Sequence, residues 1–199
     1  NAFPRQTTGV PRVLLTTFSD TLANALQSKL NRLLTHEPRL AERVDVHSLE
    51  AIGLRLYKTH VGPARLASRD DIRQLVSDAA KAVPGHKFSR QFLLAEWEHV
   101  VDAWQIDCWE AYRDVVRLGR RTRLPEAQRA VLWTIFERVR PGLREKGLVT
   151  APGLFTALAS ALKARRNSVF DFAVVDEAQD VGVAHLRFLV ALAGGEGAV

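Results

Sequence analysis

The stretch of sequence that decides the fold is Val169-Phe-Asp-Phe-Ala-Val-Val-Asp-Glu-Ala-Gln-Asp180. Six of the seven residues in 169–175 are apolar, and most of those are β-branched or aromatic, which is typical of a buried strand. The strand ends in two consecutive acids, Asp176 and Glu177. Because open parallel sheets bind ligands at the carboxyl ends of their strands, this pattern predicts a pair of carboxylates in a ligand-binding position.

Two adjacent carboxylates at such a position suit metal-assisted phosphate chemistry. Asp176 can hold Mg²⁺, directly or through a water, against nucleotide phosphates. Glu177 can orient the water that attacks the terminal phosphate in line. A competing interpretation treats residues 176–180 as an acidic cluster that stabilises the amino end of the following helix through its dipole.

The residues before this strand repeat the same alternation of strand and helix. Residues 12–18 and 43–47 are short apolar or alternating runs that predict strands. A helix is expected to follow each of them, over residues 20–34 and from Leu49 onward, with Ser19 or Asp20 and Ser48 as amino-terminal caps. The order strand, helix, strand, helix is typical of a parallel α/β unit.

The middle of the chain has a different pattern, with no strand expected between residues 70 and 165. Apolar residues at helical spacing predict helices over 70–82, 89–104, 109–118, 125–139 and 152–162. A last helix is expected over 183–193. We therefore predict an α/β fold in which residues 1–65 and 166–199 form the sheet domain and residues 66–165 form an all-helical insertion. The four tryptophans are expected in the helical core: Trp97, Trp104, Trp109 and Trp133.

Composition favours a cytoplasmic protein with a polyanionic partner. The net charge is +6, and residues 113–146 alone contain ten Arg or Lys against four Asp or Glu. A nucleic-acid contact and a solvated helix face both explain such a cluster. The single cysteine, Cys108, excludes an internal disulfide and is expected to be a buried, inert thiol. No apolar run approaches the roughly 20 residues needed to span a bilayer, so no membrane contact is expected.

The sequence Asp176-Glu177-Ala178-Gln179-Asp180 resembles motif II of the UvrD/Rep-like DNA helicases, a branch of superfamily 1. The resemblance implies a partial P-loop NTPase (RecA-like) parallel sheet with a helical insertion, and ATP with Mg²⁺ as cofactors. It also implies movement along single-stranded DNA, 3′-to-5′ by analogy with the family. In this interpretation Gln179 couples the γ-phosphate to the DNA contacts, and Asp180 is its structural neighbour.

Two further segments are similar to DNA-contacting motifs of that family. Residues 14–19 look like motif Ia, and residues 46–49 look like the motif that follows it. The DNA-binding residues implied by these motifs are Thr16, Thr17, Phe18, Ser19, His47 and Ser48. Alternatively, Phe18 is a core residue, the hydroxyls are helix caps and His47 is structural. The densest basic run is also expected to hold phosphates through Arg117, Arg120, Arg121 and Arg123.

The sequence departs from the family in one decisive respect, since it contains no Gly-Lys pair and hence no Walker A loop. We therefore expect an internal piece of the first motor domain, with the rest of its own motor domains as partner, which alone hydrolyses no ATP. Asp45 also stands where the family usually has Thr. The alternative is a non-catalytic nucleic-acid- or protein-binding module derived from a helicase. The oligomeric state, the biological pathway and the preference for DNA or RNA stay open.

Overall fold

The computed structural model describes residues 11–116, 124–165 and 170–193. The chain divides into two compact units. The first, residues 1–62 with 155–199, is called the α/β unit, and the second, residues 63–154, is called the helical unit.

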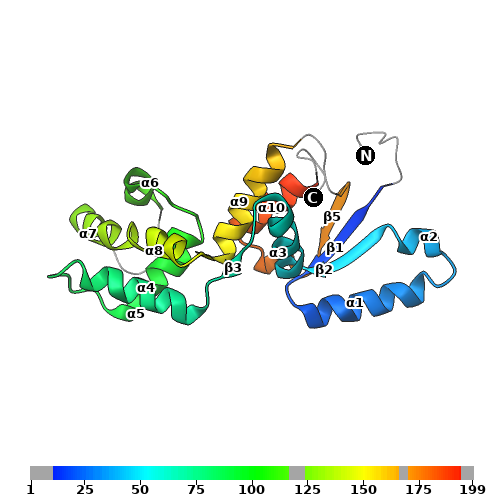
Figure 1. Cartoon of the computed structure of the whole chain (residues 1–199), viewed down its shortest axis with the longest axis horizontal. Helices are drawn as coiled ribbons and strands as arrows, with labels where there is room; N and C mark the ends of the chain where they lie inside the picture. Colours follow the sequence, from blue (N-terminus) through cyan, green and yellow to red (C-terminus); the bar gives the residue numbers. More distant parts are fainter. Residues whose placement is uncertain (1–10, 117–123, 166–169, 194–199) are drawn as a thin grey trace. The chain divides into compact units, whose positions relative to one another are not determined.

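The α/β unit is built on a three-stranded parallel sheet. Its strands are β1 (Val13–Thr17), β2 (Val44–Ser48) and β5 (Phe172–Val175), in the order β2-β1-β5. The central strand β1 lies between the other two (Figure 1). Thr17 is paired with Ser48, and Thr16 is paired with Val175. The prediction of an α/β fold with parallel strands is thereby confirmed.

One expectation about β5 is wrong, because this strand is buried on only one of its two faces. Ala173 is buried, whereas Phe172 and Val174 on the opposite face are 40% and 51% exposed. Side chains alternate between the two faces of a strand, so the exposed residues share one face. Among the described residues, nothing covers that face fully. An apolar run therefore predicted the strand correctly and its burial incorrectly.

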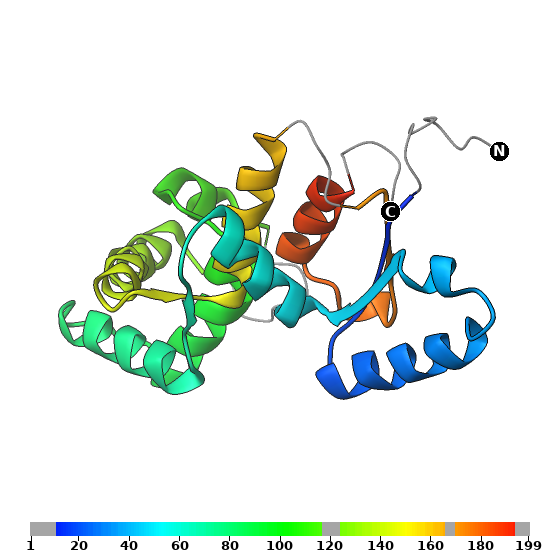
Figure 2. The same cartoon turned by 45° about the vertical axis from the view of Figure 1, so that its right-hand side comes forward.

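Among the described residues, five α-helices belong wholly or partly to the α/β unit. They are α1 (Asp20–Leu33), α2 (Pro38–Ala41), α3 (Leu49–His60), α9 (Ala151–Lys163) and α10 (Val183–Leu192). Helix α1 packs against β1 and β2, yet its apolar stripe is only partly covered, and Leu33 is 79% exposed. Helices α9 and α10 lie together (Figure 2), with the rings of Phe155 and Phe188 5.2 Å apart between centroids.

The helical unit gathers short helices around one apolar core. It contains α4 (Arg69–Lys81), α5 (Arg90–Glu96), the π-helix η1 (Trp97–Asp102), α6 (Trp109–Asp114), α7 (Glu126–Phe136) and α8 (Val139–Glu145). Helix α4 packs against α5, α7 and α8 (Figure 1). The largest buried side chains are Trp97, Tyr112, Leu132, Ile135 and Phe136. None of the described helices in either unit is long and apolar enough to cross a membrane.

The π-helix overturns two expectations about residues 89–104. The spacing predicts a single α-helix, but the α-helical turns end at Glu96 and are followed by η1 and a turn at Gln105 with φ of 53°. A π-helical turn contains an extra residue, so α-helical spacing no longer keeps residues on one face. Trp104 accordingly leaves the core and is 54% exposed. Cys108, expected to be buried, is exposed in the loop beyond.

Two further expectations in the helical unit are also corrected. Strand β4 (Leu148–Val149) pairs with β3 (Arg65–Leu66), although the sequence predicts no strand between residues 70 and 165. A two-residue strand is too short for any periodicity to reveal it. The helix expected over residues 125–139 ends earlier, at Phe136, and Pro141 lies in the first turn of α8. Proline is tolerated there because first-turn amides need no partner within the helix.

Candidate functional site at the carboxyl edge of the sheet

The carboxyl ends of the three strands meet at one edge of the sheet. Thr17 and Ser48 are register partners at the ends of β1 and β2. Asp176 follows β5 directly, and its backbone N–H donates to the carbonyl of Thr16 at 2.8 Å. The parallel sheet therefore brings the end of β1, the end of β2 and the first acid of the pair to the same edge.

The two acids adopt different conformations. Asp176 is half-buried, and its Oδ1 accepts a hydrogen bond from the N–H of Glu177 at 3.1 Å. Glu177 is exposed and has left-handed backbone angles, with φ of 60° and ψ of 45°. Such angles are uncommon outside glycine and cost roughly 1–3 kcal/mol, and such outliers cluster at functional sites.

The remaining motif residues form a short turn after the acids. Residues Ala178–Asp180 form a 3₁₀ turn, and the N–H of Asp180 donates to the carbonyl of Glu177 at 3.1 Å. Gln179 is exposed, and its side-chain amide donates to Oε2 of Glu177. The first turn of α10 contains no acid, and its amino-terminal cap is Gly182. The structure therefore gives no support to the interpretation of this cluster as a cap for α10.

The hydroxyls at this edge divide into two kinds. Ser19 and Ser48 cap α1 and α3, since their Oγ atoms accept from the backbone N–H of Leu22 at 3.1 Å and of Ala51 at 3.2 Å. Thr16 and Thr17, in contrast, are fully buried, and neither Oγ1 has a hydrogen-bond partner among the described residues. Buried polar groups are normally satisfied, so these two hydroxyls call for a functional or structural explanation.

A contact that sequence reasoning missed joins β2 to the start of α1. The Ser48 hydroxyl donates to Oδ1 of Asp20, and Ser48 is itself buried. The sequence suggests Asp20 only as a helix cap, and no local pattern reveals its pairing with a residue 28 positions away. Ser48 is thus already engaged by two groups of its own chain, which limits its freedom to contact a ligand.

Phe18 and His47 occupy half-buried positions at or near the same edge. The Phe18 ring meets His185 of α10 edge-on, with 5.9 Å between centroids. His185 also lies 4.4 Å from the Phe155 ring, and burial lowers the pKa of this histidine. The sequence offered no signal for His185. Phe18 is partly packed and partly accessible, so its position is compatible with both the core and the base-stacking interpretations.

Asp45, which departs from the family pattern, has a structural partner. Its Oδ2 accepts from the Arg12 guanidinium at 2.7 Å, and Arg12 also lies 5.3 Å from the centre of the Phe170 ring. Asp45 is paired with Leu14, three positions before the end of β1. The aspartate is therefore explained by an ion pair away from the carboxyl edge.

The edge provides the oxygen ligands that a hard cation prefers. Mg²⁺ is bound in proteins by one or two carboxylates, with hydroxyl, water and phosphate oxygens completing the shell. Asp176 and the hydroxyl of Thr17 are of that kind, and the orphaned Oγ1 is consistent with such a role. No cluster of three or more His, Cys, Asp or Glu occurs among the described residues. The chain holds no Gly-Lys pair to cradle the phosphates that would accompany the ion.

The basic run proposed from the sequence cannot be placed at this edge. Arg117, Arg120, Arg121 and Arg123 lie outside the described residues. Two neighbouring arginines are engaged within the helical unit. Arg113 forms a bidentate pair with Asp114 at 2.8 and 2.9 Å, which raises the pKa of the arginine. Arg129 donates to the carbonyl oxygens of Arg113, Val115 and Leu124, so its guanidinium has a structural role.

Comparison with known proteins adds no family to this description. No protein-family model matches the chain, and no curated protein matches it. A function must therefore be inferred from the residues gathered at the carboxyl edge and from the resemblance of residues 176–180 to the helicase motif.

Proposed function

We propose that this chain is part of an ATP-dependent DNA helicase or translocase of the UvrD/Rep-like type. The α/β unit would be a partial RecA-like motor domain, and the helical unit would be its insertion. The observation that supports this most strongly is the position of Asp176 and Glu177 directly after a parallel strand, at the edge where β1 and β2 also end. Ligand sites of open α/β sheets lie at that edge.

The two acids would divide the chemistry of hydrolysis between them. Asp176, half-buried and fixed by its bond to the next N–H, would hold Mg²⁺. Glu177, exposed and turned by its left-handed backbone, would accept a proton from the attacking water. Mg²⁺ and ATP, when bound, would supply the charge neutralisation and the phosphate that is transferred. Gln179 donates a hydrogen bond to the Glu177 carboxylate. Through this bond it would couple the γ-phosphate to the DNA contacts.

Single-stranded DNA would be contacted where the accessible residues of the edge lie. Phe18 is half-buried and Ser19 is exposed, so both can be reached from solvent. An aromatic ring at this position can stack on an unpaired base, a contact worth about 1–3 kcal/mol. Thr16 and Thr17 are fully buried, so in this proposal their hydroxyls take no direct part in the strand contact.

The uncovered faces of the α/β unit fit a motor domain that continues beyond these residues. Phe172 and Val174 expose apolar surface on one face of β5. On that face and on the stripe of α1 we expect other parts of the parent motor to pack, including the strand and helix that flank the Walker A loop. Burying apolar area stabilises by about 25 cal/mol per Å², so such packing would be favourable.

The proposal is tested by ATP hydrolysis with and without oligo-dT, in the 199-residue chain and in the natural protein that contains it. We expect no turnover by the chain alone, because the amides and lysine that cradle the phosphates are missing. In the natural protein, Glu177→Gln should lower strand-stimulated turnover by about 10²-fold or more, since a catalytic base is removed. Glu50→Gln, at an exposed position of the same unit, is the matched control.

The competing function is a non-catalytic module that grips nucleic acid. The missing Gly-Lys pair favours it. In that case the natural protein binds oligo-dT but shows no strand-stimulated hydrolysis. Turnover that survives Glu177→Gln unchanged would contradict the assignment of the catalytic base, and loss of all binding to nucleic acid would contradict both functions.

A further inference from the structure

A cavity of about 220 Å³ lies in the helical unit, where α4, the start of α5 and the segment that joins them meet. Much of its wall is apolar and is supplied by Val76, Ala80, Phe88 and Leu93. Sites for drug-sized ligands usually exceed about 300 Å³. The cavity is therefore suited to a smaller molecule that carries some apolar surface.

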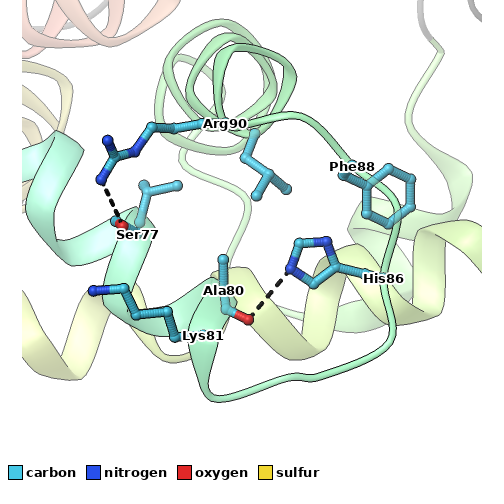
Figure 3. A pocket seen from close by; sticks show the side chains of 8 residues that line it. Ser77, Ala80, Lys81, His86, Phe88 and Arg90 are labelled. Carbon is cyan, nitrogen blue, oxygen red and sulfur yellow. Dashed lines mark hydrogen bonds between the residues drawn. The ribbon is translucent and has the colours of Figure 1, made fainter.

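One side of this cavity is cationic. Lys81 and Arg90 both line it, and Figure 3 shows them on the side opposite His86 and Phe88. Among the described residues, no acid lines the cavity. Two cations at one cavity repel each other, so an anion that contacts both is electrostatically favourable there.

A buried serine holds one of these cations in place. Arg90 donates to Oγ of Ser77 at 2.7 Å (Figure 3), and Ser77 is only 9% exposed. This bond orients the guanidinium, leaves its other N–H donors available and leaves the Ser77 proton free to donate. Lys81 is four residues after Ser77 on α4, so their side chains share one face of the helix. The three side chains thus present hydrogen-bond donors to the same cavity.

Lys81 has a competing partner that binds it only weakly. Its Nζ lies 3.2 Å from Oδ1 of Asp78, and both side chains are more than half exposed. Exposed ion pairs of this kind contribute little to stability. Asp78 also accepts from Nε2 of Gln74, so it keeps a donor when Lys81 turns to a ligand. Arg90 has no acidic partner among the described residues.

We propose that this cavity binds a small organic oxyanion. Its carboxylate or phosphate group would be held by Arg90, Lys81 and Ser77. Its short apolar body would pack on the wall that includes Val76 and Leu93. An arginine fork matches both kinds of anionic group, and charge-assisted hydrogen bonds are stronger than neutral ones. The inference does not rest on the proposed motor function, because every lining residue belongs to the helical unit.

The test is a titration of the ¹⁵N-labelled 199-residue chain, followed by amide chemical shifts at constant ionic strength. Isobutyrate should shift the amide signals of α4 and α5. Isobutyramide has the same shape without the charge and should bind about tenfold or more weakly, because the charge-assisted bonds are lost. Acetate lacks two carbon atoms and should bind about fourfold more weakly for each. Equal affinity for isobutyrate and isobutyramide would overturn the inference.

Variants of the cationic side test the same site from the protein. Arg90→Gln should raise the Kd for isobutyrate about fivefold or more, and Arg90→Lys should raise it less because the charge is kept. Lys87→Gln is the matched control, since Lys87 is exposed and lines a different cavity. Unchanged amide signals away from the cavity show that each variant is folded. If Arg90→Gln binds isobutyrate like Lys87→Gln, the inference is wrong.

A variant at Asp78 should have the opposite effect. Asp78→Asn removes the competing charge beside Lys81, so it should tighten isobutyrate binding about twofold. Weaker binding by this variant would contradict the role given to Lys81.

Isopropyl phosphate separates the two sources of the anionic group, because it carries the same apolar body on a phosphate. Tighter binding of isopropyl phosphate than of isobutyrate identifies a phosphate ester as the ligand class, and the reverse order identifies a carboxylate. If neither compound shifts the amide signals of α4 and α5, no oxyanion site exists at this cavity.

Discussion

At the scale of single residues, the two threonines at the end of β1 are the clearest sign of a functional demand. Both hydroxyls are buried and have no hydrogen-bond partner among the described residues. Leaving a buried hydroxyl unpaired destabilises a fold by about 1–3 kcal/mol. Valine has nearly the same shape, needs no partner and is common in strands. Stability alone would therefore favour valine at these positions.

Thr17→Val should raise the free energy of unfolding by about 1 kcal/mol, because it removes an unpaired polar group without leaving a cavity. The measurement is urea unfolding followed by far-UV circular dichroism, since all four tryptophans lie in the helical unit. A decrease of about 1 kcal/mol or more would contradict the prediction, because it would mean that the hydroxyl is hydrogen-bonded in the folded chain.

At the scale of elements, a buried polar network fixes the end of the π-helix to the start of α9. Asp102, the last residue of η1, is buried and accepts from Thr150 Oγ1 and from Gln105 Nε2, both at 2.7 Å. Thr150 also accepts from the N–H of Gly153 at 3.1 Å, in the first turn of α9. Burial raises the pKa of Asp102, while its hydrogen bonds and Arg140 oppose that shift. The network therefore links the last residue of η1 to the first turn of α9.

Thr150→Val should lower the free energy of unfolding of the helical unit by about 1–3 kcal/mol, because it leaves the Asp102 carboxylate without its hydroxyl donor. Tryptophan fluorescence during urea unfolding reports on this unit specifically. Thr17→Val is the matched comparison, since the same threonine-to-valine change is expected to raise the free energy of unfolding there and to lower it here. Equal effects of the two substitutions would show that hydrogen bonding does not distinguish the two sites.

Helix α10 should make the stability of the chain depend on pH through His185. Its Nδ1 accepts from the N–H of Gly182 at 3.3 Å, which requires the neutral ring, and burial lowers its pKa. The unfolded chain therefore binds this proton at higher pH than the folded chain does. The contribution of the neutral His185 ring to the free energy of unfolding is fully present above the usual histidine pKa of about 6.5. It is lost as the pH falls from there through the lowered pKa of the folded chain.

His185→Gln should reduce the loss of unfolding free energy between about pH 7 and pH 5, by about 1.4 kcal/mol for each unit of pKa depression that is removed. Circular dichroism of urea unfolding at several pH values measures the slope. His36→Gln, at an exposed position of the same unit, is the matched substitution. An unchanged slope in His185→Gln would place the pH dependence elsewhere in the chain.

At the scale of the whole molecule, the excess of positive charge should govern the affinity for nucleic acid. The net charge is +6, and the pI is near 10.0. Raising salt from about 50 to 200 mM should weaken oligo-dT binding roughly tenfold if two to three phosphates are contacted, because counterion release is less favourable at higher salt. Anisotropy titrations at fixed pH measure this. Affinity that does not respond to salt would argue against any phosphate contact.

Much of the α/β unit could be predicted from local pattern. The runs at 12–18, 43–47 and 169–175 contain β1, β2 and β5, because β-branched residues bounded by caps and turns specify a strand locally. Ser19 and Ser48 cap the helices expected after the first two strands, since a hydroxyl before an apolar helical pattern satisfies the first-turn amides. Asp176 and Glu177 stand out as a pair because they end such a strand.

What the sequence determined by itself is therefore the order of elements in the α/β unit, their caps and the candidate acids, all of which depend on residues within a few positions of each other. Only the tertiary structure decided that β1 lies between β2 and β5, that Ser48 bonds to Asp20, that the threonine hydroxyls are buried, and that Trp104 and Cys108 are exposed. Strand order, burial and side-chain pairing depend on which distant segments pack together. The periodicity of apolar residues predicts that a face is buried, but it does not identify the segment that packs against that face.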